Sequence, residues 1–255
     1  MKIIYIIIVL LATIIGSSSG LGGGVIIKPC LDFLAYHDIA NISFISSCAV
    51  FSMSLYSTYR HFRMGTEIKY KIVLFISLGS MLGGKLGNAA FNVLLKLIGS
   101  VTLQKAQSLI MVMLLLLVMV SVKYKVQIKT KQGPIMSIVV GLCLGFISAF
   151  IGIGGGPINV AAYMILYGVD IKEASVLSLA TILFAQSSNL MTTQINGGFI
   201  RFDVKILKLV IPSALVGASI GTKLNKVLKE SSIQSIFMGT LIFLIILNTY
   251  NFFIT

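Results

Sequence analysis

The sequence predicts an all-α integral membrane protein made of two internally repeated units, each with about four spans and one broken half-helix, or roughly 8–10 membrane segments. Three observations predict this class. The chain of 255 residues is 57% hydrophobic and only 11% charged, with a mean hydropathy of +1.01. Long runs carry no charged residue, and one glycine string occurs twice. Soluble domains of this length carry more charge, so we expect a multi-pass protein of the cell (inner) membrane.

The apolar runs define the spans of each unit. Unit one, residues 1–122, has spans at roughly 3–16, 40–58, 72–94 and 106–122; unit two, residues 134–255, has them at roughly 134–150, 174–192, 207–223 and 232–250. Crossing a ~30 Å hydrocarbon core takes roughly 20 apolar residues. The basic linker 123–133 separates the units. The first run imitates a signal peptide, but unit two keeps its equivalent lead-in, so we expect residues 3–19 to be retained.

The repeat begins with the strings "GLGGG" at 20–24 and "GIGGG" at 152–156. At the same shift of 132 positions, Asp38-Ile39 matches Asp170-Ile171, and the pair Ser43 and Ser46 matches Ser175 and Ser178. At a shift of 138, Gly79, Gly83 and Lys85 match Gly217, Gly221 and Lys223. Apolar composition alone does not place glycine, aspartate and serine in register. Internal duplication is therefore expected, as in many secondary transporters.

A short apolar run follows each glycine string, at 25–36 and at 157–168. Twelve helical residues span about 18 Å, which is too short to cross the core. A helix that starts inside the membrane presents free N–H groups and the positive end of its dipole, and such a start binds anions. We expect the two starts to converge near the midplane as one anion site. Close helix packing is the alternative for these glycines, and we prefer it for Gly79-x-x-x-Gly83 and Gly217-x-x-x-Gly221.

The candidate substrate-binding residues combine both strings with polar side chains inside apolar runs. They are Gly20, Gly22, Gly23, Gly24, Gly152, Gly154, Gly155, Gly156, Asn159, Ser178, Gln186, Ser187 and Asn189. Hydrogen bonding between helices is an equal alternative for any one polar residue.

Four charged residues within the apolar part of the chain need an explanation. Lys28 and Asp32 lie four residues apart and could form an ion pair. Two functional roles are the alternatives: Lys28 attracts the anion, or Asp32 carries a coupling proton. Lys85 and Lys223 are expected near span ends, with their amines at the headgroups.

Other chemistries find little support. The cysteines Cys30, Cys48 and Cys143 have no disulfide or metal spacing, and no nucleotide-binding loop is present. We therefore expect no cofactor, no metal and no enzymatic activity. The net charge of +13 lies in short loops between spans, which indicates orientation in the membrane rather than nucleic-acid binding.

Two topologies remain open. If each short run continues its lead-in as one broken span, the units are parallel, both termini are cytoplasmic, and the loops at 60–71, 123–132 and 193–206 share that side. If each short run returns as a hairpin, the halves are inverted and the termini are outside.

The paired GxGGG strings, the duplicated four-span unit and the length resemble the TauE/SafE sulfite exporter family, also called the 4-toluenesulfonate uptake permeases. This resemblance implies transport of sulfite, sulfonates or related small organic anions. The sequence thus predicts a permease for a small inorganic or organic anion, surrounded by membrane lipid, with a homodimer left open. A passive anion channel that uses the same site is the alternative.

Overall fold

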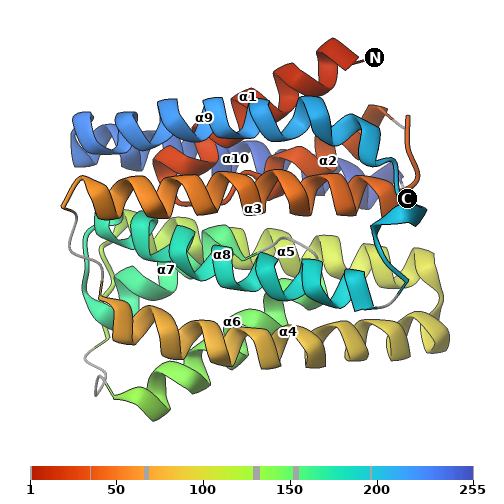
Figure 1. Cartoon of the computed structure of the whole chain (residues 1–255). Coiled ribbons are helices and arrows are strands. Elements are labelled where there is room, and N and C mark those ends of the chain that lie inside the picture. The colour runs from red at the N-terminus through yellow and green to blue at the C-terminus, as the bar shows by residue number, and fades with distance from the viewer. Residues whose placement is uncertain are drawn as a thin grey trace.

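A computed structural model describes residues 2–34, 36–65, 69–128, 133–151, 155–195 and 197–254, which are almost entirely helical and contain no strand within these ranges. The helices are α1 (Lys2–Ser19), α2 (Gly24–Leu34), α3 (Ile39–Arg63), α4 (Tyr70–Ile98), α5 (Ser100–Lys123), α6 (Pro134–Ile151), α7 (Gly156–Tyr167), α8 (Ile171–Ile195), α9 (Leu207–Val227) and α10 (Glu230–Ile254). Two 3-10 turns, η1 (Phe199–Arg201) and η2 (Val204–Ile206), join α8 to α9. Both termini lie at the same end of the helical bundle (Figure 1).

Seven of the described helices are long and apolar enough to cross a membrane: α1, α4, α5, α6, α8, α9 and α10. The predicted all-α multi-pass class is therefore confirmed. Each predicted span falls on one helix to within a few residues, and the short runs form α2 and α7. α3 is a further helix of 25 residues that covers the predicted span 40–58 and carries no charged side chain before Arg60.

α2 and α7 each fold back along the helix that precedes them. The hydroxyl of Tyr5, near the start of α1, bonds the Nδ1 of His37, which follows α2, at 2.6 Å. The hydroxyl of Ser137, near the start of α6, bonds that of Tyr167, at the end of α7, at 2.8 Å. Each pair of helices is thus a hairpin. The alternative in which the short run continues its lead-in as one broken span is wrong.

Helices approach each other closely at the two GxxxG motifs that the sequence analysis identified. A Cβ at Gly79 would lie 2.1 Å from the carbonyl oxygen of Ile138, and one at Gly83 would lie 2.0 Å from that of Leu142. These contacts make α4 and α6 a parallel pair. On the other side, a Cβ at Gly221 would lie 2.3 Å from the carbonyl oxygen of Ile14, so α9 and α1 form a similar pair. The prediction that these glycines serve packing is confirmed.

α3 and α8 lie side by side and run in opposite directions (Figure 1). Phe44, in the second turn of α3, stacks on Phe202 beyond the end of α8, with ring centroids 4.3 Å apart. At the other end, Lys69 precedes α4 and pairs with Glu173, in the first turn of α8, at 2.9 Å. α4 therefore runs parallel to α8 and antiparallel to α3.

α9 runs in the same direction as α3. The backbone N–H of Asp203, before α9, donates to Asn41 at 2.8 Å, and the Nζ of Lys226, in its last turn, donates to the carbonyl oxygen of Met64 at 3.1 Å. α1 runs parallel to α9, and α6 runs parallel to α4. α1 and α6 therefore run in opposite directions. This is the arrangement of the inverted alternative. Buried apolar side chains form two clusters, one around α1, α2, α3 and α9 and one around α5, α7 and α10, and α8 contributes to both.

Candidate functional site

The first glycine string forms a tight turn between α1 and α2. Gly22 and Gly23 have φ angles of +81° and +57°, which glycine adopts without steric cost. A Cβ at Gly16 would lie 2.2 Å from the backbone nitrogen of Gly23, so the turn packs directly onto α1. The N–H groups of Ile26 and Ile27 both donate to the carbonyl oxygen of Gly23 at 2.9 Å, and α2 begins there.

The second string starts α7 beside this turn. Gly152 and Gly154 lie outside the described residues, and Gly155 has a φ of +85° as the N-cap of α7. A Cβ at Gly156 would lie 1.8 Å from the carbonyl oxygen of Leu21. The two strings therefore meet, but the start of α7 packs against backbone.

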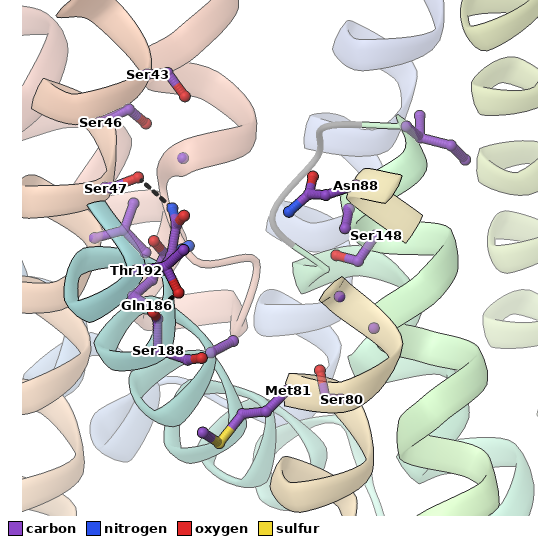
Figure 2. Close-up of a pocket in the computed structure, with 18 of the residues that line it drawn as sticks. Ser43, Ser46, Ser47, Ser80, Met81, Asn88, Ser148, Gln186, Ser188 and Thr192 are labelled. Carbon is purple, nitrogen blue, oxygen red and sulfur yellow. Dashed lines mark hydrogen bonds between the residues drawn. The ribbon is translucent and has the colours of Figure 1, made fainter. Parts of the chain in front are cut away.

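A cavity of about 390 Å³ opens at the start of α2. Its first wall comes from α2, α3 and α8, and its second wall from α4, α5 and α6. Figure 2 shows Ser46, Ser47, Gln186 and Ser188 on one side of it and Ser80, Asn88 and Ser148 on the other. Most of these side chains are hydroxyls or amides, so the cavity offers hydrogen-bond donors from both walls.

The charge of the cavity is positive. Lys28 of α2 and Lys85 of α4 both line it, and no aspartate or glutamate is among the described residues that do so. Lys85 lies near the middle of α4, so the expectation that it sits at a span end is wrong. Its sequence counterpart Lys223 is exposed in the penultimate turn of α9, as expected.

Lys28 and Asp32 do not form the ion pair that their spacing allowed. The two ion pairs found in the described part of the chain join His37 to Asp203 and Lys69 to Glu173. Asp32 is exposed and does not line the cavity. The amine of Lys28 is thus available to the cavity rather than neutralised by its helix neighbour.

The structure divides the candidate residues into two groups. Gly22, Gly24, Gln186 and Asn189 line the cavity. The described candidates that do not line it are Gly20, Gly23, Gly155, Gly156, Asn159, Ser178 and Ser187.

Three polar members of the second group are held by local contacts. The hydroxyl of Ser178 donates to the carbonyl oxygen of Gly20 at 2.7 Å, and that of Ser187 donates to its own helix. Asn159 is buried beside Gly155 in the first turn of α7. Ser178 and Asn159 therefore contact the glycine turns, whereas the hydroxyl of Ser187 bonds within α8.

The two candidate amides that line the cavity lie on one face of α8. Asn189 donates through Nδ2 to the hydroxyl of Ser47 at 3.0 Å, the dashed line at Ser47 in Figure 2. The Oε1 of Gln186 is buried and has no hydrogen-bond partner. Because the oxygen and nitrogen of an amide are interchangeable in such assignments, Gln186 offers either an acceptor or a donor to a solute.

Sequence reasoning missed the contribution of α4. Ser80, Gly84 and Asn88 recur at intervals of four, with Lys85 beside them, and all line the cavity. A row of small and polar residues with one lysine in the middle of an apolar span was the signal available. Gln107 of α5 also lines the cavity, and its amide donates to the carbonyl oxygen of Phe150.

Comparison with known proteins supports membrane transport. The model of the sulfite exporter TauE/SafE family matches residues 5–248. The probable membrane transporter protein YunE of Bacillus subtilis is 25% identical over 260 residues, which is 94% of each chain. Sulfite exporter TauE/SafE family protein 5 of Arabidopsis thaliana is 33% identical over 110 residues, 43% of this chain and 24% of that protein.

A second partial match is the probable membrane transporter protein MamO of Magnetospirillum gryphiswaldense, 29% identical over 119 residues, 45% of this chain and 19% of that protein. No solved structure matches. The full-length family match and the all-helical multi-pass fold lead to one conclusion: the chain is a membrane transporter that belongs to the TauE/SafE sulfite exporter family.

Proposed function

We propose that the chain is a secondary permease for small anions and that the cavity at the start of α2 is its binding site. The observation that carries this proposal is a cavity of about 390 Å³ that two lysines line and that no acidic side chain among the described residues enters. A positively charged cavity of this kind within the membrane-spanning part of the chain favours anions. Cavities of this size hold small organic molecules, so a sulfonate with its organic group fits as well as sulfite.

The proposed site uses one half-helix start, not two. Gly22 and Gly24 line the cavity, so the first turn of α2 directs its positive dipole end toward a bound anion. Lys28 follows Gly24 by one helical turn. The start of α7 contacts Leu21 instead and supports this turn. The names of two matches, sulfite exporters, make sulfite the first substrate to test.

Alternating access fits the inverted course of the helices. We infer that residues 1–122 and 134–255 are inverted repeats, in which the pair α4·α6 corresponds to the pair α9·α1. The end that carries the linker also carries Arg60, Arg63, Lys69 and Lys71, which favours the cytoplasmic side for that end. The termini then lie outside.

The cavity is confined to one end, which favours a carrier over a channel. The α3 residues that line it stop at Val50, and the α8 residues begin at Ala185. Toward the linker end α3 packs on α9, where the hydroxyl of Thr222 donates to that of Ser57 at 3.0 Å. A cavity that opens toward one end and is closed by packing at the other is what an alternating-access carrier requires.

The test is sulfite flux into proteoliposomes, with Gly24→Leu as the variant. A Cβ at Gly24 would lie 3.0 Å from a methyl of Val50 and 3.5 Å from the Ser46 hydroxyl. A leucine side chain there would therefore occupy the cavity at the start of α2. We also expect Gly23→Leu and Gly155→Leu to abolish transport, but both would strain the backbone, because these glycines have positive φ angles. Gly24 has a helical backbone, so Gly24→Leu tests the cavity without that strain. We expect saturable flux with counterflow in the wild type and its loss in Gly24→Leu.

Gly239→Leu is the matched control, because a Cβ at Gly239 meets nothing within 4 Å. It should leave flux unchanged. Wild-type flux in Gly24→Leu would remove the α2 start from the site, and unitary currents would show a channel rather than a carrier.

A further inference from the structure

Lys85 occupies a position in α4 that needs a physical reason. It lies 15 residues after Tyr70 and 13 before Ile98, or about 20 Å from either helix end at 1.5 Å per residue. At that depth a lysine is costly unless water or an opposite charge compensates it. The cavity supplies access to water, but no carboxylate of the described residues pairs with Lys85.

Lys28 and Lys85 come from opposite walls of the cavity. Lys28 belongs to α2, which packs on α3, whereas Lys85 belongs to α4, which packs on α6. Neither lysine has an ion-pair partner among the described residues. The cavity therefore carries two positive charges, and a bound anion with one negative charge leaves one lysine uncompensated.

The second half of the chain does not reproduce this pair. Val160 stands at the position that matches Lys28, and Lys223, which matches Lys85, lies four residues before the end of α9 rather than near the middle of its helix. The amine of Lys223 can reach the lipid headgroups because the residue lies near a helix end. Lys85 is too far from either end of α4 for its amine to do so. The two charges thus belong to one cavity and not to a general feature of the repeat.

We propose that Lys85, acting with Lys28, makes this cavity selective for anions that carry two negative charges. A dianion neutralises one lysine on each wall. The hydroxyls and amides between them, including the amide of Gln186, whose Oε1 has no hydrogen-bond partner, bond its remaining oxygens. A monoanion binds at the α2 start and leaves Lys85 without a counter-charge. This inference rests on the proposed anion site and specifies the charge of its substrate.

Two anions of similar chemistry and different charge test the inference. Thiosulfate is a dianion and methanesulfonate a monoanion, and each is measured as a competitor of sulfite uptake and as a ligand by calorimetry on the purified protein. We expect the wild type to prefer thiosulfate. Lys85→Gln should weaken thiosulfate roughly tenfold or more, as the loss of a charged hydrogen-bond partner does, and leave methanesulfonate nearly unchanged.

Two further variants control for folding and for general charge. Lys223→Gln removes the matched but exposed lysine and should change neither affinity. Lys85→Arg keeps the charge and should keep the preference for thiosulfate, which separates a charge effect from damage to α4. Thermal unfolding verifies that each variant is folded.

Each outcome decides one proposal. Equal weakening of both anions by Lys85→Gln, or no change in either, overturns the role of Lys85 in charge selection. Wild-type protein that binds both anions equally well also overturns it, yet leaves the anion permease intact. Wild-type protein that carries neither anion, and no sulfite, overturns the proposed function itself.

Discussion

The glycines of the two strings act through contact distance as much as through φ. Gly20, with a φ of +76°, approaches the backbone of Ser175 so closely that a Cβ would lie 2.4 Å from its Cα. Gly156 is in helical backbone, but its Cβ would lie 1.8 Å from the carbonyl oxygen of Leu21. A side chain at either position would force apart the turn before α2 and the helices around it. At the residue scale these glycines keep the two hairpin turns together.

Gly156→Ala should therefore destabilise the protein although alanine is the better helix former. The added methyl meets backbone that cannot rotate away, and overpacking of this kind costs about 1–3 kcal/mol. We expect a lower midpoint of thermal unfolding for the purified protein in detergent. Gly239→Ala, in the open part of α10, should leave the midpoint unchanged or raise it. Equal midpoints for both variants would show that the Leu21 contact is not tight in solution.

At the scale of elements, the matched Asp-Ile pairs of the sequence are helix caps. Asp38 accepts the backbone N–H of Asn41 at 2.7 Å at the start of α3. Asp170 accepts those of Lys172 and Glu173 at 2.8 and 2.9 Å at the start of α8. The N–H of Asn41 lowers the pKa of the Asp38 carboxyl. Its contribution to stability is therefore present at neutral pH and is lost only when the pH falls through that lowered pKa.

Asp170→Ala should lower the stability of α8 by about 1 kcal/mol, the usual cost of losing an N-cap. Asp170→Asn keeps an accepting oxygen and should retain most of the stability. Chemical or thermal unfolding monitored by circular dichroism measures the difference. Equal stability of the alanine and wild-type proteins would show that water replaces the cap at no cost.

Two neighbouring glycines of α4 have different roles: Gly83 packs against α6, and Gly84 lines the cavity. Gly83→Ala places a methyl 2.0 Å from the carbonyl oxygen of Leu142, whereas the nearest atom to a Cβ at Gly84 is 4.0 Å away. Gly83→Ala should therefore lower the unfolding midpoint by separating α4 from α6. Gly84→Ala should unfold like the wild type while it narrows the cavity. A larger loss of stability in Gly84→Ala would reverse the assignment of these two faces.

At the scale of the molecule, a second set of polar side chains lies buried toward the linker end. Ser17, Ser57, Ser178 and Thr222 come from α1, α3, α8 and α9 and are fully buried. Under the sequence shifts of 132 and 138, three of them correspond to cavity positions: Ser178 to Ser46, Ser57 to Asn189, and Thr222 to Gly84. If the halves are inverted repeats, these side chains line the pathway when the cavity closes and the opposite end opens.

Cysteine accessibility tests this exchange in oriented vesicles, after Cys30, Cys48 and Cys143 are replaced by alanine. A membrane-impermeant thiol reagent should label Ser47→Cys from the side of the termini. During sulfite exchange it should label Ser57→Cys from the linker side. Ala214→Cys, buried in the apolar core of α9, should stay unlabelled. Failure to label Ser57→Cys from either side during transport would show that these hydroxyls only pack.

The link between Lys69 and Glu173 closes the same end. It joins the segment before α4 to the first turn of α8 at 2.9 Å, two residues before Ser175. Opening toward the linker therefore separates these residues, so Glu173→Gln should increase the labelling rate of Ser57→Cys. Glu230→Gln, which removes a carboxylate without an ion pair in the described residues, should not.

The spans, the two half-helices and the packing role of the GxxxG motifs followed from the sequence alone, whereas the capping role of Asp38 and Asp170 came from the structure. Each depends on contacts within one helix or on burial in lipid, which hydropathy and local spacing record directly. The cavity was predicted less completely: Gln186 and Asn189 do line it, but Lys85 was assigned to a span end, and Ser178, assigned to the solute, bonds the carbonyl oxygen of Gly20. Whether a polar side chain faces a cavity or a neighbouring carbonyl depends on helix rotation, which one helix does not determine.

The sequence by itself determined a multi-pass helical protein with two short helices that start inside the membrane, because a 12-residue helix cannot cross the hydrocarbon core. Only the tertiary structure decided between continued and returning short helices, and it gave the α2 start, not the α7 start, to the cavity. The position of the cavity depends on contacts between distant backbone segments. The carbonyl of Leu21 occupies the space in front of Gly156, and the cavity separates α4 and α6 from α3. Such contacts join residues more than a hundred positions apart, where no local pattern in the sequence reports them.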